Sequence, residues 1–198
     1  MSESANTLEK RKVSTTHRIT ICAQKLTDQR GFDGFTMDEL AEAAQVSRRT
    51  LFNYFPGKLD AVLGPGPELP DQVIETFRAG GPNGDFIADI KVLIAAMVDI
   101  KGFDRDEALV ARRIFKTNPR LLLAVHERFH AVTELFTDLI LDREGQDFGR
   151  HRARILINVL ACLFDVALED VLSDTTGRRE LDAAYFEAFD TLRGVLSC

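Results

Sequence analysis

Apolar residues recur at intervals of three or four positions along most of the chain, which is the spacing of one face of an α-helix. No segment sustains a strict alternation of apolar and polar residues, and no Asn-Gly or Asp-Gly pair joins two β-branched runs. Strands are therefore not expected. The pattern predicts an all-α fold.

The first long helix is expected over residues 14–30, because Ser14 is a good N-cap and Gly31 is a typical helix stop. Residues 64–70 read Gly-Pro-Gly-Pro-Glu-Leu-Pro, which indicates a loop and a domain boundary. Between Gly31 and that loop we expect three short elements before Pro56 and a helix that ends near residue 63. Beyond the loop, helices are predicted at about 71–79, 85–101, 104–117, 119–143, 147–173 and 178–196.

Two C-terminal segments indicate that the chain pairs with a second copy. The run 155–168 is apolar nearly all round, so this helix must be covered on both sides. It is shorter than the roughly 20 residues that a membrane span needs, and it contains Asn158 and Asp165, so we do not expect a membrane protein. The last helix carries a heptad-like apolar stripe, and the two helices together predict a symmetric four-helix dimer seam. The residues expected in this interface are Leu160, Phe164, Leu181, Tyr185 and Leu192.

Charge is distributed unevenly along the chain. The net charge is −6, but residues 1–60 hold nine Lys or Arg against eight Asp or Glu, and the remainder holds 16 against 23. Affinity for nucleic acid is therefore expected only at the N-terminal end. The first residues lack the apolar segment of a signal peptide, and the three cysteines lack metal-like spacing. We expect a cytoplasmic protein without a metal or a cofactor.

A helix-turn-helix is predicted over residues 36–55, which read TMDELAEAAQVSRRTLFNYF. Thr36 and Glu39 have the spacing of a capping box, which begins the first helix. The turn is Gln45-Val46-Ser47, in which Val46 is the apolar plug between the helices and Ser47 caps the second one. The inner face of the first helix consists of the small or apolar residues Leu40, Ala41 and Ala44.

The second helix of this motif is expected to enter the major groove of double-stranded DNA. Leu51 and Phe55 lie one turn apart and point to the core, which leaves the polar residues outward. Arginine bonds bidentately to guanine, asparagine bonds to adenine, and threonine offers hydroxyl or methyl contacts. A tyrosine hydroxyl, a lysine ammonium and a helix start are suited to phosphates. The expected DNA-binding residues are Thr36, Ser47, Arg48, Arg49, Thr50, Phe52, Asn53, Tyr54 and Lys58.

Residues 31–62, GFDGFTMDELAEAAQVSRRTLFNYFPGKLDAV, resemble the tetracycline-repressor (TetR) family, in which an aromatic-rich recognition helix precedes a helix begun by lysine. The resemblance implies a homodimeric transcriptional regulator, usually a repressor that a small apolar effector releases from its operator. The sequence itself predicts a flexible arm at 1–13, and the resemblance implies a three-helix helix-turn-helix domain at 14–63 and a C-terminal helical bundle for dimerisation and effector binding at 71–198. The candidates for lining an effector pocket are Ile90, Leu93, Met97, Phe115, Val125 and Phe129. The alternative is that these residues are part of the ordinary hydrophobic core.

Two positions depart from the family pattern. Gln45 stands where many members have glycine, and a left-handed backbone there would cost on the order of 1 kcal/mol. Phe52 stands where a tyrosine hydroxyl often touches DNA, so that phosphate bond is lost, although Phe52 is suited to a thymine methyl.

Two other functions compete with DNA binding. His126, Glu127 and His130 satisfy H-E-x-x-H, the helix motif of zinc hydrolases. Arg128 places a charge where such an enzyme packs its helix. No further motif supplies an obvious third ligand, and Glu134, one turn on, is a weak candidate, so we expect two solvated or hydrogen-bonded histidines and no enzyme. The other alternative is a helical module whose hairpin binds protein.

Overall fold

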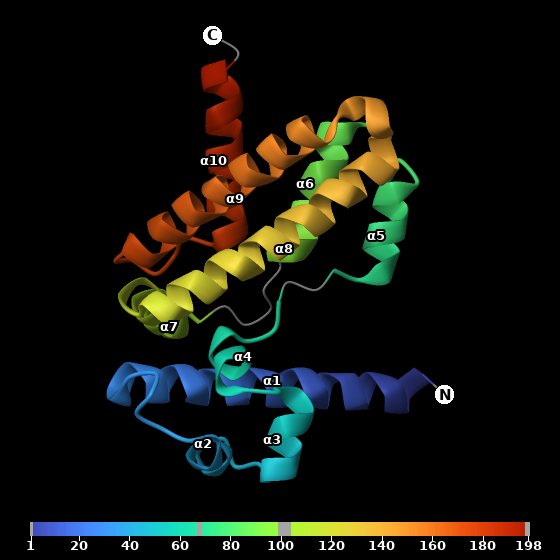
Figure 1. The fold of residues 1–198 in the computed structure, drawn as a ribbon. Coiled ribbons are helices and arrows are strands. Elements are labelled where there is room, and N and C mark those ends of the chain that lie inside the picture. Colours follow the sequence, from blue (N-terminus) through green and yellow to red (C-terminus); the bar gives the residue numbers. More distant parts are fainter. Residues whose placement is uncertain (1, 67–68, 99–103, 197–198) are drawn as a thin grey trace. The chain divides into compact units, whose positions relative to one another are not determined.

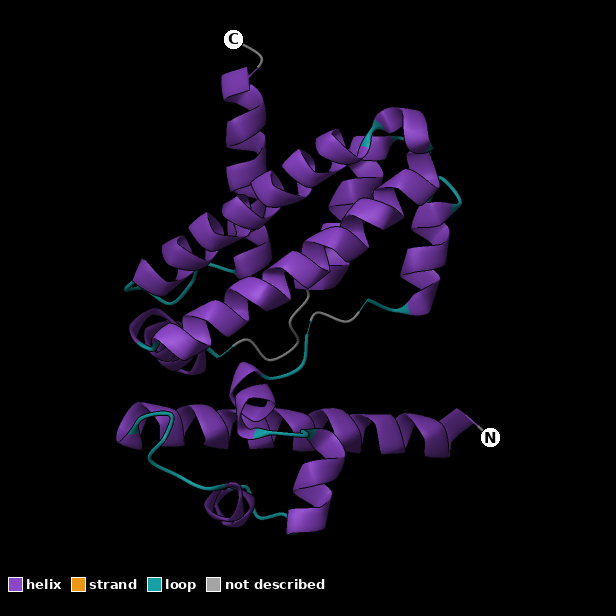
Figure 2. Ribbon diagram, in the orientation of Figure 1, coloured by secondary structure: helices purple, strands orange, loops and turns teal. Residues whose placement is uncertain are grey.

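The computed structural model describes residues 2–66, 69–98 and 104–196, with side chains for all of these except 2–12 and 97–98. Every regular element of these residues is helical, as Figure 2 shows, so the all-α prediction is confirmed. None of the described helices is long and apolar enough to cross a membrane. The elements are α1 (Ser2–Arg30), α2 (Met37–Ala43), α3 (Arg48–Tyr54), α4 (Lys58–Leu63), α5 (Asp71–Arg78), α6 (Phe86–Val98), α7 (Arg105–Thr117), α8 (Pro119–Glu144), the 3-10 helix η1 (Gln146–Phe148), α9 (Arg150–Ser173) and α10 (Leu181–Leu196).

Several helix boundaries differ from expectation. Helix α1 begins at Ser2, so residues 2–13 are helical where a flexible arm was expected; this stretch contains no glycine or proline. Two helices, rather than three short elements, precede Pro56. Gly149 has φ 85°, a left-handed conformation that separates η1 from α9. The expected end of the helix at 85–101 lies partly outside the described residues.

Helix α7 and the start of α8 belong with the N-terminal helices. Arg113 donates two hydrogen bonds to the carboxylate of Asp28 on α1, at 2.7 and 2.6 Å, and Arg120 donates to Asp33 at 3.0 Å. Residues 104–128 therefore pack with the N-terminal helices, although they follow the 64–70 loop that was expected to separate the domains. Hydrophobic periodicity shows which face of a helix is buried, but it does not show on which domain the helix packs. The first compact unit contains the described residues of 1–66 and 104–128, and the second contains those of 67–103 and 129–198.

The first unit is built around α1, which contacts α2, α4 and α7 (Figure 1). Gln24 of α1 donates to the carbonyl of Val62 at 3.0 Å, and Arg128 donates to the carbonyls of Leu63 and Gly64 at 3.3 and 2.5 Å. These bonds satisfy acceptors at the C-terminal end of α4. The core of this unit includes the buried residues Ile19, Ala23, Leu26, Leu40, Ala44, Leu51, Phe55, Val62, Ile114 and Leu121.

The second unit packs α5, α6, α9 and α10 with the part of α8 that begins at Phe129. Within it, the Tyr185 hydroxyl donates to the carbonyl of Leu160 at 3.1 Å, and burial raises the pKa of Tyr185. Leu160, Leu181 and Tyr185 are only 8%, 6% and 2% exposed and lie in the core of one copy. The expected place of these three residues in a dimer interface is therefore corrected, since the first part of the heptad-like stripe, Leu181 and Tyr185, packs against the chain's own helices.

Candidate nucleic-acid interface

The start of α2 is fixed by the predicted capping box. The Thr36 hydroxyl accepts from the N–H of Glu39 at 3.2 Å, and the Glu39 carboxylate accepts from the N–H of Thr36 at 2.7 Å. Hydrogen bonds from the N–H and the hydroxyl of Thr36 hold the pKa of Glu39 below its ordinary value. The N–H and the hydroxyl of Thr36 are therefore both hydrogen-bonded to Glu39.

The turn between α2 and α3 follows the sequence prediction. Gln45 has φ 54°, so its backbone lies in the left-handed region. The N–H of Val46, which is half-buried against the core, donates to Ala41 at 2.9 Å. Ser47 is the N-cap of α3, and its hydroxyl accepts from the N–H of Thr50 at 3.0 Å. These bonds set the angle at which α3 leaves α2.

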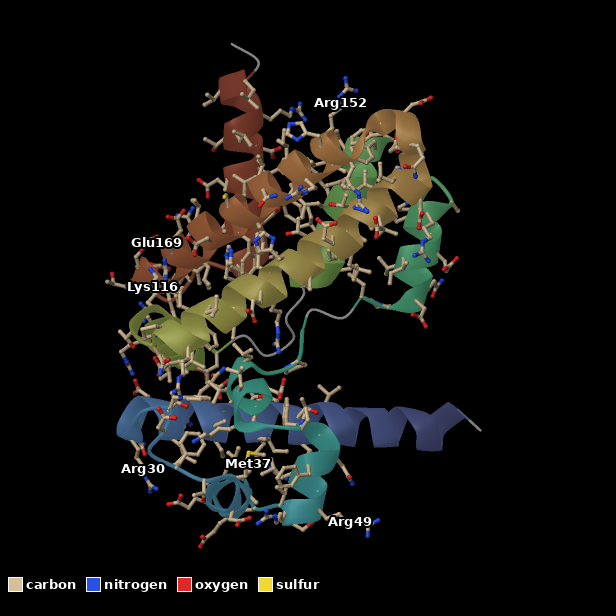
Figure 3. The ribbon with its side chains drawn as sticks, in the orientation of Figure 1. Arg30, Met37, Arg49, Lys116, Arg152 and Glu169 are labelled. Atoms are coloured by element: carbon tan, nitrogen blue, oxygen red, sulfur yellow. The ribbon has the colours of Figure 1, made fainter. Side chains whose placement is uncertain are left out.

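Helix α3 has a buried side and an exposed side. Leu51 is fully buried and Phe55 is 5% exposed, as predicted, whereas Arg49 and Asn53 are exposed and Phe52 is 42% exposed. Figure 3 shows Arg49 projecting from the start of α3 away from α1, while Met37 lies between α2 and α1. The exposed side therefore presents a guanidinium, an amide and an aromatic edge together.

Arg48 and Thr50 are engaged by neighbours within the motif. The guanidinium of Arg48 donates to both carboxylate oxygens of Asp38 on α2, at 2.7 and 2.6 Å, and lies 5.5 Å from the ring centroid of Phe52. The hydroxyls of Thr50 and Ser47 are 2.7 Å apart and share a hydrogen bond. The exposed residues Arg49 and Asn53 are not directed inward by a bond of this kind.

The side chains of Lys58 and Tyr54 pack against other residues of the first unit, although the sequence suggested that both face DNA phosphates. The Lys58 ammonium donates to the carbonyl of Phe35 at 2.6 Å and lies 4.5 and 5.1 Å from the ring centroids of Phe35 and Phe32. Tyr54 is half-buried against the core of the first unit. The partners of Lys58 were not predicted, although the sequence shows two aromatic residues, Phe32 and Phe35, in the segment Gly-Phe-Asp-Gly-Phe.

The residues expected to line an effector pocket are divided between the two units. Ile90 and Leu93 are 1% and 3% exposed in the core of the second unit. Phe115 packs against the core of the first unit, and Val125 belongs to that unit, whereas Phe129 belongs to the second. The side chain of Met97 lies outside the described residues. The pocket therefore stays a prediction.

The H-E-x-x-H motif lies on α8 with His126, Glu127 and His130 all exposed. Among the described residues, no group of three or more His, Cys, Asp or Glu is placed to hold a metal ion. Arg128, between the histidines, bonds the last carbonyls of α4 as described above. Arg128 therefore has a structural role, and the histidines on either side of it, His126 and His130, are exposed.

An apolar surface on α9 and α10 was only partly anticipated. Ile155, Val166 and Val195 are 51%, 50% and 69% exposed in the single chain. A groove of about 390 Å³ runs between the two helices. Its lining includes the apolar residues Leu163, Val166, Ala188, Leu192 and Val195, of which only Leu192 was predicted. In the sequence, the spacing of the apolar residues 188, 192 and 195 indicated that they share one face of α10.

Comparisons with known proteins agree with this geometry. Residues 22–62 match the family described as "Bacterial regulatory proteins, tetR family". The chain is 26% identical over 155 residues to the HTH-type transcriptional activator FasR of Mycolicibacterium smegmatis, covering 76% of this chain and 69% of that protein. It is 25% identical over 171 residues to the HTH-type transcriptional regulator TcmR of Streptomyces glaucescens, covering 82% and 76%. The matched family segment spans the capping box, the left-handed turn and α3, and residues 22–62 of the chain carry the N-terminal domain of the tetR family of bacterial regulatory proteins.

Proposed function

We propose that the protein is a transcriptional regulator, and not an enzyme, that binds a double-stranded DNA operator as a homodimer in the cytoplasm and needs no cofactor. The observation that carries this proposal is the two-sided α3. Leu51 and Phe55 hold the helix to the core, and Arg49, Phe52 and Asn53 face outward with the hydrogen-bonding and apolar groups that distinguish base edges.

The apolar surface of α9 and α10 supports a symmetric dimer. Apolar side chains that gather at one exposed groove, as Val166, Leu192 and Val195 do, indicate an interface. Helix α9 also begins with basic residues and ends with acidic ones; Figure 3 shows Arg152 and Glu169 at its opposite ends. When two copies of α9 pack antiparallel about a two-fold axis, the basic end of each meets the acidic end of the other.

The regulator is proposed to respond to a small apolar molecule held in the second unit. The core of that unit is mostly apolar, and the hydroxyl of Thr137 is fully buried there without a hydrogen-bond partner among the described residues. A polar atom of a bound effector would relieve the cost of that orphaned hydroxyl. Native mass spectrometry of the purified dimer tests this: a retained small molecule of reproducible mass is expected, and a homodimer that binds no candidate apolar ligand opposes it.

The central experiment for the proposed function is selection of duplexes from a random pool by the purified protein. Two recognition helices on a dimer require half-sites about one DNA turn apart, roughly 34 Å. The expected outcome is an inverted repeat with that spacing. Recovery of unrelated duplexes with no shared sequence would oppose the proposal and favour the protein-interaction alternative.

The direction of regulation is proposed to be repression. A dimer that covers its operator blocks polymerase where the operator overlaps a promoter. Transcription in vitro from a template carrying the selected operator at the promoter should fall when the protein is added and recover with its effector. Increased transcript from such templates would instead make this chain an activator, the role given in the name of FasR.

A further inference from the structure

The chain passes between the two compact units at three places, and these places differ in structure. One passage lies in the glycine- and proline-rich segment 64–70, and another lies directly before residue 104. The third lies between Arg128 and Phe129, inside the 26-residue helix α8. A helix carries a displacement along its length, whereas loop residues absorb it in their backbone angles. Among the described residues, α8 is the helix that belongs to both units.

Arg128, the last residue of α8 in the first unit, is bonded to the C-terminal end of α4. Its Nη1 atom donates to the carbonyls of Gly64 and Leu63, at 2.5 and 3.3 Å. The last carbonyls of a helix have no partner within it, and a positive charge is favourable at that end of the helix dipole. Helix α4 has only six residues, and its N-cap makes no side-chain capping bond. Such a short helix depends on the contacts at its end, and Arg128 supplies two of them.

The same end of α4 fits closely against α1. Gly64 has φ 70°, and a Cβ atom at this position would lie 2.9 Å from Cγ2 of Thr20 on α1, so a side chain there would require Thr20 to move. The side chain of Gln24, also on α1, donates to the carbonyl of Val62 at 3.0 Å. Three consecutive carbonyls are thus bonded by side chains of α1 and α8. A shift of α8 therefore acts on a closely packed junction.

Helix α4 follows the recognition helix almost directly. Helix α3 ends at Tyr54 and α4 begins at Lys58, so the connection consists of residues 55–57. Leu51 of α3 and Val62 of α4 are both fully buried in the core of the first unit. A displacement of α4 therefore changes how α3 is held, and with it the direction in which the exposed side of α3 faces.

The other end of α8 is fixed inside the second unit. Arg143 donates to the carbonyl of Phe77 in α5 at 3.1 Å and to the carboxylate of Asp89 in α6 at 2.6 Å. Thr137, between this end and the boundary of the units, is fully buried, and α8 contributes Phe136 and neighbouring residues to the core. A molecule that enters the core beside α8 therefore shifts this helix.

We propose that Arg128 is a positioning residue through which the second unit regulates the DNA-binding helix: α8 carries the change, and the bonds from Arg128 pass it to the end of α4 and so to α3. This inference rests on the proposed function and names the path of its regulation. Coupling between two binding sites is reciprocal, so DNA bound to α3 must change the second unit by the free energy that the effector exerts in the opposite direction. The duplex itself is therefore a sufficient probe.

Hydrogen exchange followed by mass spectrometry measures this coupling in the full chain, with and without the duplex that the wild type selects. We expect exchange in peptides from residues 129–144 to change by about fivefold or more when the duplex binds to the first unit. Unchanged exchange in these peptides, while peptides from α3 become protected, would overturn the proposal.

Arg128→Met tests whether this residue is the link. The variant removes no DNA-facing group and should still select the same sequence, but the duplex should no longer change exchange in residues 129–144. The matched control is Arg120→Met, which removes an exposed arginine of the same helix, paired with Asp33 at 3.0 Å, and should respond as the wild type does. A response that persists in Arg128→Met would contradict the role assigned to Arg128.

Arg128→Gln takes the place of Arg128→Met if circular dichroism shows that the latter does not fold. Glutamine keeps a hydrogen-bond donor but is shorter and uncharged, so the response should fall severalfold, and a full response would overturn the proposal. The two levels of the account fail differently. If the wild type selects no duplex, the proposed function is wrong; if a duplex binds and the second unit does not respond, the path through α8 and Arg128 is wrong.

Discussion

The guanidinium Nη2 of Arg143 donates to the Oδ2 atom of Asp89 at 2.6 Å, and these side chains are 4% and 0% exposed. The pair joins the end of α8 to α6 inside the second unit. Asp89 also accepts from the N–H and the side-chain amide of Asn83, at 2.7 and 2.9 Å. Burial opposes ionisation of Asp89, but the hydrogen bonds from Asn83 and Arg143 outweigh it and hold its pKa below the ordinary value.

Asp89→Asn should therefore lower the thermal unfolding midpoint strongly near neutral pH, because it leaves a buried guanidinium without its anion. A carboxyl with a depressed pKa stabilises the fold above its unfolded pKa, near 4, and this contribution disappears as the pH falls through the folded pKa. The difference between wild type and Asp89→Asn should stay constant from pH 8 to 5 and shrink below about pH 4.

The matched control for that variant is Asp142→Asn, since Asp142 pairs with Arg78 at 3.2 Å on the surface and is 52% exposed. Exposed pairs contribute little to stability, so its midpoint should remain close to wild type. Equal effects of the two variants would contradict the structural role assigned to the buried pair.

Gln45→Gly should stabilise the first unit by about 1 kcal/mol, because glycine adopts the observed φ of 54° without the penalty that a side chain carries. Denaturant unfolding followed by circular dichroism measures this change. Glu42→Gly, on the exposed side of α2, is the control and should destabilise by about the same amount. A destabilising Gln45→Gly would show that the turn is not left-handed in solution.

Local rules were enough to predict the helix-turn-helix. The interval between Thr36 and Glu39, the small inner residues of α2, and the pair Leu51 and Phe55 all act within a few residues of each other, so spacing alone specifies them. The left-handed backbone at Gln45 was suggested only by the resemblance, because many members of the family have glycine at that turn position.

Contacts between distant residues were not predictable in this way. Lys58 and Phe35 are 23 positions apart, and Arg143 and Asp89 are 54 apart, and nothing in either local pattern pairs them. Periodicity also identified the stripe containing Tyr185 without showing that it faces Leu160 of the same chain. A hydrophobic pattern defines which face of a helix is buried, but it does not define which residues that face packs against.

Dimerisation through α9 and α10 can be tested with Val166→Arg, which changes a residue that is 50% exposed in the single chain and so should not disturb its core. Leu192→Arg changes the same groove from α10. Sedimentation at micromolar concentration should show monomers for both variants and dimers for Ala183→Arg, an exposed α10 residue outside the groove lining. Persisting dimers in both groove variants would move the interface elsewhere.

Arg48 is predicted to act by neutralising Asp38 instead of contacting bases. Arg48→Ala leaves an unpaired carboxylate on α2 next to the phosphate backbone, so binding should weaken for all duplexes alike. Adding Asp38→Asn should restore most of the affinity. Loss of preference at one base pair in Arg48→Ala, with no restoration by Asp38→Asn, would instead make Arg48 a base contact.

Arg49→Ala, measured by repeating the duplex selection, tests the assignment of the outward side of α3 most directly. The expected result is a folded dimer that has lost its preference at one position of each half-site, at about 1–3 kcal/mol, while other positions and the salt dependence change little. An unaltered preference at every position, in a variant that still binds the duplex, would contradict the claim that this side of α3 reads DNA.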